Sequence, residues 1–488
     1  MRTLAVESIE HILKEQKKKS GKKAKKSKSA NVNEVQCGSV ISDNVKLLED
    51  LECDCKLGPG STFAALTVVG PAVLDLNGNT VSCTDNSWDT SQTDLSSVIS
   101  VMGRGGAILN GVVSTGNFGI VLQGDGHHLV EGVTITKTAN DGLQVNSPFC
   151  EVTSNTLLDN GLGIYSTEEL LTECKGNLIG CEFVEDECPE QFDANDPSAV
   201  PCFNGDVSGD GIDIGEGSQY SVVYNNVIKN FGDDGLSCRG NYNIIKDNDV
   251  YIDEFNPRTS KSEDGITALG FGNQIIGNMI QNTNKDGIDI KFNEKDDDCD
   301  QEFTGGFNII RSNKVKAPAD GKGIKIGSNN NFIVSNSVES VQNDAGFNID
   351  TTDCDIGGNR NYLADNISAN NAEAGFKIEE TNNNVIVRNT ATDNKEEGFV
   401  LSVEEVSGEV RGLANILAGN NASGNGDGPD FNEKGDDAVD CTQNAYIGNN
   451  APSIADADPA CMLGEAIDLQ LKEETKKLKG IEQYYSRN

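Results

Sequence analysis

The sequence contains no long hydrophobic run. Hydrophobic residues make up 36% of its 488 residues, yet no window approaches the roughly 18 consecutive apolar residues that a membrane-spanning helix needs. The first thirty residues also lack the apolar segment of a secretory signal. We therefore expect a protein without a membrane span.

Histidine and positive charge are scarce. Three histidines, and cysteines without paired Cys-x-x-Cys spacing, argue against a zinc site. Basic residues number 39 and acidic residues 77, so the net charge is −38. Residues 1–28 hold ten of the basic residues and three acidic ones, which leaves −45 for the rest. Such an acidic body repels nucleic acid, and we expect residues 1–36 to form a lysine-rich, disordered arm.

Cysteine, by contrast, is abundant. The fourteen cysteines are an even number, and most of them lie near the two ends of the chain or in a polar insertion at residues 167–208. This distribution predicts disulfides that staple the ends and the insertion, which requires an oxidising compartment. We therefore expect an exported protein, extracellular or at a cell surface, whose signal lies outside this sequence or is not recognisable in it.

A repeat, with most steps of 21 to 24 residues, runs through the chain. It is marked by a glycine followed by an apolar residue, any residue and another apolar residue, at Gly119, Gly142, Gly163, Gly211, Gly235, Gly265, Gly287, Gly323, Gly346, Gly375 and Gly398. A second column consists of asparagines: Asn225, Asn248, Asn278, Asn313, Asn336, Asn366, Asn389 and Asn420. Two such columns in each repeat predict short strands joined by turns.

The alternation within the repeat predicts the fold class. In Gly211–Ile214 and Gly287–Ile290 the isoleucines would point to one side of a strand and the aspartates to the other. No intervening segment is long and periodic enough for a crossover helix, so the chain must coil on itself. We predict an all-β protein with a single parallel β-helix over residues 37–462, with about eleven coils along the glycine column and more on either side. Residues 463–488 would form an amphipathic capping helix, and the stacked asparagines a structural ladder.

This pattern resembles the right-handed parallel β-helix proteins with a pectin-lyase-like fold. The resemblance covers residues 37–450 and includes the run from Val73 to Thr80, which is similar to the first coils of that family. It implies a right-handed solenoid. Members include polysaccharide lyases, glycoside hydrolases, epimerases and non-catalytic surface proteins, so the implied partner is a polysaccharide of a cell wall or matrix.

Two acidic columns run along the expected solenoid. The residue before the repeat glycine is an aspartate in four consecutive coils: Asp210, Asp234, Asp264 and Asp286. Asp213 and Asp289 occupy the outward position two residues after the glycine. Carboxylates stacked about 4.8 Å apart raise one another's pKa, gather a cation, or turn apart to cap backbone N–H groups. The sequence leaves these three interpretations open.

One stretch is similar in order and spacing to the motifs of polygalacturonase-type glycoside hydrolases. The matching segments are 209–213, 232–235, 263–267 and 288–291. The resemblance implies that Asp210, Asp233 and Asp234 supply the general acid and the water-activating base, and that Lys291 binds a substrate carboxylate. Asp264 and Asp289 stand where that family has histidine and arginine, so galacturonan is not the expected substrate.

The same acids support a second reaction. Their hard oxygens suit calcium, with ligands from Asp210, Asp234, Asp264, Asp286 and Asp289. Bound calcium would acidify the proton beside a uronate carboxylate, and Lys291 or Lys325 would remove it, which is β-elimination. Further side chains are expected to contact the sugar: Asp213, Arg239, Asp264, Asp289, Lys377 and Tyr165.

The expected function is therefore that of an exported, monomeric β-helix protein that binds and cleaves a polysaccharide along an acidic outer sheet. The enzyme would be a glycosidase or a calcium-assisted lyase. The alternative is a non-catalytic β-helix protein with a glycan-binding, structural or adhesive role at the cell surface.

Overall fold

A computed structural model describes residues 35–55, 64–84, 97–161, 209–253, 264–292, 305–351, 357–406, 409–426, 430–435 and 444–451. The chain separates into two compact units, Val35–Cys461 and a second unit formed by the two terminal segments. The predicted lysine-rich arm, the cysteine-rich insertion and the capping helix lie outside the described residues. In the ranges described, no helix is long and apolar enough to cross a membrane.

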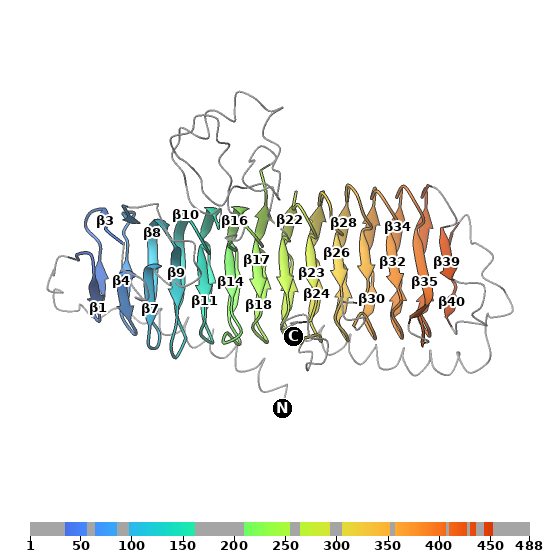
Figure 1. Cartoon of the computed structure of the whole chain (residues 1–488), viewed down its shortest axis with the longest axis horizontal. Helices are drawn as coiled ribbons and strands as arrows, with labels where there is room; N and C mark the ends of the chain where they lie inside the picture. Colours follow the sequence, from blue (N-terminus) through green and yellow to red (C-terminus); the bar gives the residue numbers. More distant parts are fainter. Residues whose placement is uncertain are drawn as a thin grey trace, which may run out of the picture. The chain divides into compact units, whose positions relative to one another are not determined.

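The first face of the solenoid is a parallel sheet with one strand from each coil (Figure 1). Its strands are, in spatial order, β1 (Ser39–Ile41), β4 (Ala64–Val69), β7 (Ser97–Met102), β9 (Phe118–Leu122), β11 (Leu143–Val145), β14 (Ile212–Ile214), β17 (Leu236–Cys238), β20 (Ile266–Ala268), β23 (Ile288–Ile290), β26 (Ile324–Ile326), β29 (Phe347–Ile349), β32 (Phe376–Glu379), β35 (Phe399–Val406) and β39 (Phe431–Gly435). A short antiparallel strand, β36 (Glu409–Arg411), pairs with the end of β35.

Two further rows of parallel strands complete the coils. The second row contains β2 (Val45–Lys46), β5 (Val73–Asp75), β8 (Ala107–Gly116), β10 (Leu129–Thr138), β12 (Glu151–Thr153), β15 (Val222–Tyr224), β18 (Ile244–Lys246), β21 (Gln274–Ile276), β24 (Ile309–Arg311), β27 (Phe332–Val334), β30 (Tyr362–Ala364), β33 (Val385–Val387), β37 (Ile416–Ala418) and β40 (Ala445–Ile447). The third row contains β3 (Leu51–Cys53), β6 (Thr80–Cys83), β13 (Thr156–Asn160), β16 (Val227–Phe231), β19 (Asp249–Tyr251), β22 (Met279–Gln281), β25 (Lys314–Lys316), β28 (Ser337–Glu339), β31 (Ile367–Ala369), β34 (Thr390–Thr392) and β38 (Asn421–Ser423). The long strands β8 and β10 run through both rows.

The predicted parallel β-helix is confirmed by this pairing, with one correction to the coil count. Leu143 of β11 pairs directly with Ile212 of β14, so the segment that contains Gly163 adds no coil to the first face. The glycine pattern overcounted here because Gly163-Ile164-Tyr165 matches the repeat locally, and Gly163 itself lies outside the described residues.

The repeat glycines are required by close approach of neighbouring coils. A Cβ atom added to Gly235 would lie 2.6 Å from the carbonyl oxygen of Gly265 and would also collide with Val250. The apolar residues on either side of the central strand position point inward and are fully buried. At the later coils this core includes stacked rings, with Phe347, Phe376 and Phe399 4.7 to 4.8 Å apart. Each such pair contributes about 0.5–1.5 kcal/mol beyond its buried area.

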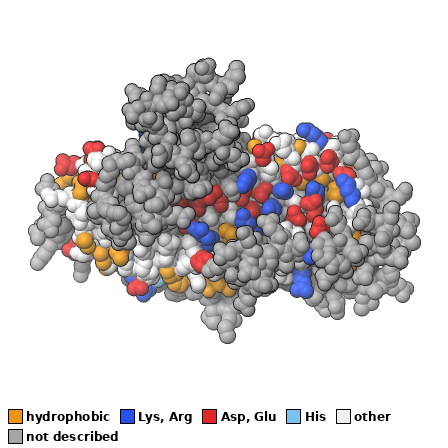
Figure 2. All heavy atoms as spheres, viewed as in Figure 1, with side chains coloured by type: hydrophobic (Ala, Val, Ile, Leu, Met, Phe, Trp, Pro, Cys, Tyr) orange, Lys and Arg blue, Asp and Glu red, His pale blue; other side chains and the backbone are white. Residues whose placement is uncertain are grey.

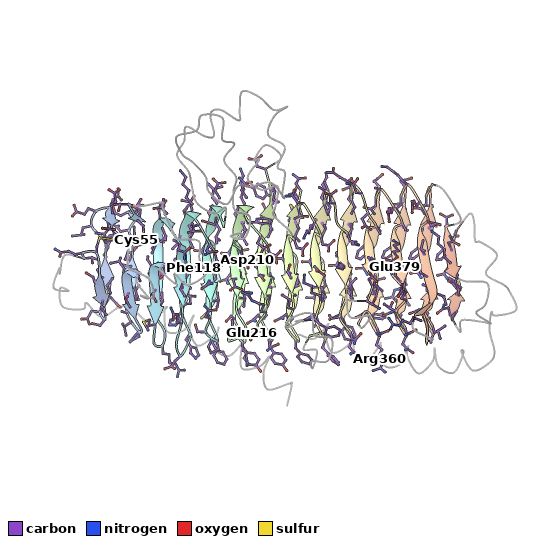
Figure 3. All side chains as sticks on the ribbon, viewed as in Figure 1. Cys55, Phe118, Asp210, Glu216, Arg360 and Glu379 are labelled. Atoms are coloured by element: carbon purple, nitrogen blue, oxygen red, sulfur yellow. A yellow bond between two sulfur atoms is a disulfide. The ribbon has the colours of Figure 1, made fainter. Side chains whose placement is uncertain are left out.

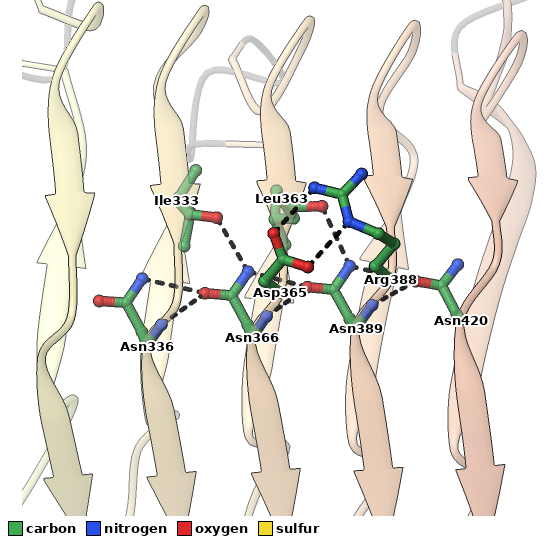
Figure 4. Close-up of polar contacts among 8 residues, drawn as sticks. All are labelled: Ile333, Asn336, Leu363, Asp365, Asn366, Arg388, Asn389 and Asn420. Atoms are coloured by element: carbon green, nitrogen blue, oxygen red, sulfur yellow. Dashed lines mark hydrogen bonds and ion pairs between the residues drawn. The ribbon is translucent and has the colours of Figure 1, made fainter. Parts of the chain in front are cut away.

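The asparagine column forms the predicted ladder (Figure 4). The backbone N–H and the Nδ2 of Asn336 both donate to Asn366 Oδ1, at 2.9 and 3.0 Å. Asn366 repeats these two bonds to Asn389, and its Nδ2 also donates to the carbonyl of Ile333 at 2.8 Å. One correction concerns the first member, because Asn226, not Asn225, occupies the ladder position.

Disulfides fasten the first coils, as predicted. Cys37 bonds to Cys53, and Cys55 to Cys83. Cys150 and Cys238 are buried free thiols, so these two act as small core residues and not as staples. The cysteines of the insertion and of the C-terminal end lie outside the described residues.

Candidate functional site on the acidic outer face

The aspartates before the repeat glycines form a ladder of their own. Each Oδ1 accepts the backbone N–H of the aspartate on the next coil, at 2.8 to 3.1 Å, through Asp141, Asp210, Asp234, Asp264 and Asp286. Asp286 Oδ1 in turn accepts the backbone N–H of Lys322, so the capping interpretation is confirmed for one oxygen of each of the four predicted aspartates. The same arrangement keeps like charges on successive coils, because every carboxylate must sit at the same turn position.

A second column lies on the outward side of the central position of each first-face strand. In register, its members are Gln144, Asp213, Ser237, Thr267, Asp289, Lys325, Asn348 and Lys377. Figure 2 shows acidic and basic side chains gathered together on this side of the molecule. The columns thus combine into one charged outer face.

Two aspartates of this outer column are ion-paired, and each leaves one oxygen without a partner. Asp213 Oδ2 lies 2.7 Å from Arg239 Nη2, and Asp289 Oδ2 lies 3.1 Å from Lys291 Nζ. Both aspartates are only 2% exposed. Their Oδ1 atoms are buried and accept no hydrogen bond from any residue that the structure describes. A buried polar atom without a partner costs about 1–3 kcal/mol, so these oxygens are suited to a ligand.

Three carboxylates converge closely enough to hold a cation. Oxygens of Asp264, Asp286 and Asp289 all lie within 4.8 Å of one another. The predicted ligands Asp210 and Asp234 are not in this group, because they sit on the two preceding coils of the ladder. Carboxylate oxygens are the ligands that calcium prefers, and the unpartnered Oδ1 of Asp289 fits such an ion.

Burial and mutual repulsion raise the pKa values of the ladder. Burial raises the pKa of Asp234 to about 7, and the neighbouring Asp233 adds to the effect. Burial, with the charge of Asp289, raises the pKa of Asp286 to about 6. The pKa of Asp264 is also well above its usual range, again because of burial and then of Asp234. The face therefore holds its negative charge at a cost, and a bound cation would relieve it.

The basic residues of the face differ in whether they form ion pairs with neighbouring carboxylates. Burial alone would lower the pKa of Lys291, but Asp289 and Asp264 outweigh it and hold that pKa above its ordinary value. Lys377 is paired with Glu373 and Glu379, at 3.7 and 3.0 Å. Lys325 is half-buried, and it forms no ion pair with any residue in the described part of the chain. Its register neighbours are Asp289 and Asn348.

The structure therefore brings most of the predicted site residues onto one face. Asp210, Asp233 and Asp234 precede β14 and β17, and Arg239 follows β17, whereas Lys291 follows β23. Tyr165 lies outside the described residues. The sequence analysis did not assign Asn348 to the site. Its Oδ1 is buried and has no hydrogen-bond partner within the described ranges, and it lies between Lys325 and Lys377 in the column. Its place in the outer column was the available signal.

No protein-family model matches this chain, and no curated protein matches it. Among solved structures, the Dettilon tailspike protein gp208 is 17% identical with a TM-score of 0.42, over 82% of this chain and 60% of the tailspike. The chain thus spans less than two thirds of that protein.

Two enzymes of known structure are similar at the same level. The A-module of mannuronan C-5 epimerase AlgE6 from Azotobacter vinelandii is 13% identical, with a TM-score of 0.41 and 84% coverage of both chains. The pectate lyase Pel9A is 14% identical, with a TM-score of 0.34, over 62% of this chain and 68% of the lyase. The assignment of the parallel β-helix fold rests on the strand pairing of the chain itself, and the resemblance to β-helix proteins is confirmed at that level.

Proposed function

We propose that this protein modifies an anionic polysaccharide on its charged outer face, by cation-assisted β-elimination within a uronate chain. The observation that carries the proposal is the convergence of Asp264, Asp286 and Asp289, one coil away from a lysine that no described residue pairs with, Lys325. We also infer that it works outside the cytoplasm, because its disulfides Cys37–Cys53 and Cys55–Cys83 need an oxidising compartment.

Because the face is negatively charged, we expect a bound cation to lie between the protein and a negatively charged substrate. The aspartates stacked on the acidic face repel a polyuronate at that face. Asp264, Asp286 and Asp289 would hold a calcium ion through hard oxygen ligands. When bound, calcium supplies positive charge that neutralises a substrate carboxylate and acidifies the adjacent C–H bond.

Lys325 is the candidate base. In its neutral form, Nζ accepts the proton from the carbon beside the substrate carboxylate. The electron pair of that C–H bond becomes a carbon–carbon double bond as the bond to the glycosidic oxygen breaks, and the departing oxygen takes a proton from solvent. Lys291 is less suited to this step, because its ion pair with Asp289 keeps it protonated. Its positive charge instead orients Asp289.

A second reaction is favoured by one observation. The pKa of Asp234, raised to about 7, is matched to a general acid at neutral pH. With Asp233 or Asp210 as the partner carboxylate, the face would then hydrolyse a glycosidic bond. Hydrolysis yields new reducing ends without a double bond, so the product separates the two reactions.

The test is product formation on a panel of polyuronates, with calcium or with EDTA. Elimination predicts ultraviolet absorbance from unsaturated uronides in calcium only. The Lys325→Ala variant should lose the activity, whereas Lys314→Ala, an exposed lysine of β25, should keep it. Reducing ends without absorbance would instead indicate hydrolysis, and no product at all would favour a non-catalytic protein.

A further inference from the structure

A stripe of aromatic side chains runs along a turn of the solenoid that the proposed reaction does not use. We call the aromatic stripe the set His127, Phe149, Tyr220, Tyr242, Phe271 and Phe307. They come from successive coils, immediately before the second-row strands β10 to β24. Neighbouring ring centroids are 4.9 to 5.5 Å apart.

Three of the six rings are exposed, and the other three are half-buried. Phe149, Tyr242 and Phe307 are 41%, 40% and 44% exposed. The first four rings are nearly parallel, within 13° of one another pairwise, and the ring of Phe271 is then turned by 77° relative to Tyr242. A contiguous patch of exposed apolar side chains often marks an interaction site, whereas isolated exposed apolar residues are common on any protein surface.

The aromatic residues of the stripe adopt a backbone conformation that is unfavourable for aromatic side chains. Phe149, Tyr220 and Tyr242 have φ of 57°, 57° and 58°, in the left-handed region. Bulky residues are rare there, and asparagine is much better tolerated. At the equivalent position of later coils the chain indeed has Asn330 and Asn383. Ring stacking offsets part of this strain, but stacking does not require that the rings remain two-fifths exposed.

The stripe leads to a polar pocket on the same turn. We call the amide pocket the cavity of about 320 Å³ lined by Asn329, Asn359, Arg360, Asn382 and Asn383. The amide oxygens of Asn329, Asn359 and Asn382 each accept one backbone N–H. An amide oxygen can accept a second hydrogen bond and an amide NH₂ group can donate two, as a ligand rich in hydroxyl groups requires. Arg360 is exposed and forms no ion pair with the described residues. Figure 3 shows Arg360 at the lower edge of the coils and Asp210 on the first face, so this turn is distinct from the acidic site.

We propose that the aromatic stripe and the amide pocket together bind a linear anionic glycan, as a second surface that holds the polymer beside the acidic face. This inference takes only the class of ligand, an anionic polysaccharide, from the proposed function. A periodic surface with one ring per coil, about 4.8 Å apart, suits a periodic polymer whose sugar rings offer C–H groups to aromatic rings. Arg360 provides a charge for an acidic sugar, and the column of stripe and pocket residues contains no carboxylate.

The test is a binding measurement in EDTA, so that a cation site on the acidic face cannot contribute. Isothermal titration would use polygalacturonate as the anionic probe and hydroxyethyl cellulose as the neutral one. The double variant Phe149→Asn, Tyr242→Asn removes two rings but installs the residue that later coils carry at this position, so folding should persist. Ile367→Thr, at an exposed isoleucine of β31, is the matched control.

We expect the double variant to weaken polygalacturonate binding by about tenfold, Arg360→Gln to weaken it severalfold, and Ile367→Thr to leave it unchanged. Hydroxyethyl cellulose should bind more weakly than polygalacturonate. Unchanged affinity in the double variant, or no binding of polygalacturonate in EDTA, would overturn the proposal. A change in self-association by sedimentation in place of a change in affinity would assign the stripe to a contact between copies of the chain, and would also overturn it. Product formation by the Lys325 assay is read separately, so either proposal can fail alone.

Discussion

Replacing Asp234 by asparagine should stabilise the protein at high pH and not at low pH. Asp234 accepts the backbone N–H of Asp264 through Oδ1 at 3.0 Å, and an asparagine Oδ1 can keep this bond. The substitution removes only the buried charge. Burial and Asp233 raise the pKa of Asp234 from 3.8 to about 7, so ionisation is disfavoured in the folded state relative to the unfolded chain. Ionised Asp234 therefore destabilises the folded state. This destabilisation is absent below pH 4, grows between pH 4 and 7, and is complete above pH 7.

The size of this effect follows from the shift. A difference of about three pKa units corresponds to about 4 kcal/mol at most, and less where neighbouring aspartates share the protons. In a chain of this length, each kcal/mol moves the thermal midpoint by about 2 °C or less. We therefore expect Asp234→Asn to raise the midpoint by several degrees at pH 8, measured in EDTA, and to leave it unchanged at pH 4.

The matched control is Asp43→Asn, at an exposed aspartate near the start of the solenoid, which should move the midpoint little at either pH. A loss of stability in Asp234→Asn that is the same at pH 4 and pH 8 would refute the reasoning, because it would mean that packing and not charge dominates at this position. Activity adds a second readout: if Asp234 is the general acid of a hydrolase, the stabilised variant should be inactive.

Two further predictions concern the cation cluster and the asparagine ladder. Calcium at a hundredfold excess over its Kd should stabilise the protein by about 2.7 kcal/mol, and Asp289→Asn should remove this response in a calcium titration of the midpoint. Asp213→Asn, at an equally buried and ion-paired aspartate outside the cluster, should retain it. Asn366→Ala should lower the free energy of unfolding by about 3 kcal/mol in urea denaturation. The Asn336 N–H loses its acceptor, Asn336 Nδ2 loses one of its two acceptors, and the Ile333 carbonyl loses the bond from Asn366 Nδ2. Asn421→Ala, at a half-buried residue of β38, should cost less than about 1 kcal/mol, and equal effects of the two substitutions would contradict the ladder argument.

The fold could be predicted because each coil repeats the same steric demands. A glycine is needed wherever a Cβ atom would collide with the next coil, as at Gly235. An asparagine is needed wherever the side chain at a turn must accept the backbone N–H of the neighbouring coil. Such demands recur in the sequence at every coil. The error at Gly163 arose because a local match does not report which strands pair, and β11 pairs with β14 across the whole insertion.

The site could be predicted only as a surface. The outer columns follow from alternation, so the sequence brought Asp213, Asp289 and Lys325 to one face. The aromatic stripe escaped notice because its residues are defined by a turn conformation and not by strand alternation. Phe271 even lies one residue before the column shared by Tyr242 and Phe307, with Gly272 at the equivalent place.

The distinction between Lys291 and Lys325 shows what pairing adds to a pattern. Lys291 lies two residues after Asp289 on the same side of the chain, so the two side chains meet without any contribution from another coil. Lys325 lies beside Asp289 on the next coil, with uncharged Asn348 on its other side. Because Asp289 is already engaged by Lys291, Lys325 has no carboxylate left to pair with in its own column. The ion pair within one coil is the reason that the proposed reaction assigns the base to Lys325 on the next coil and not to Lys291.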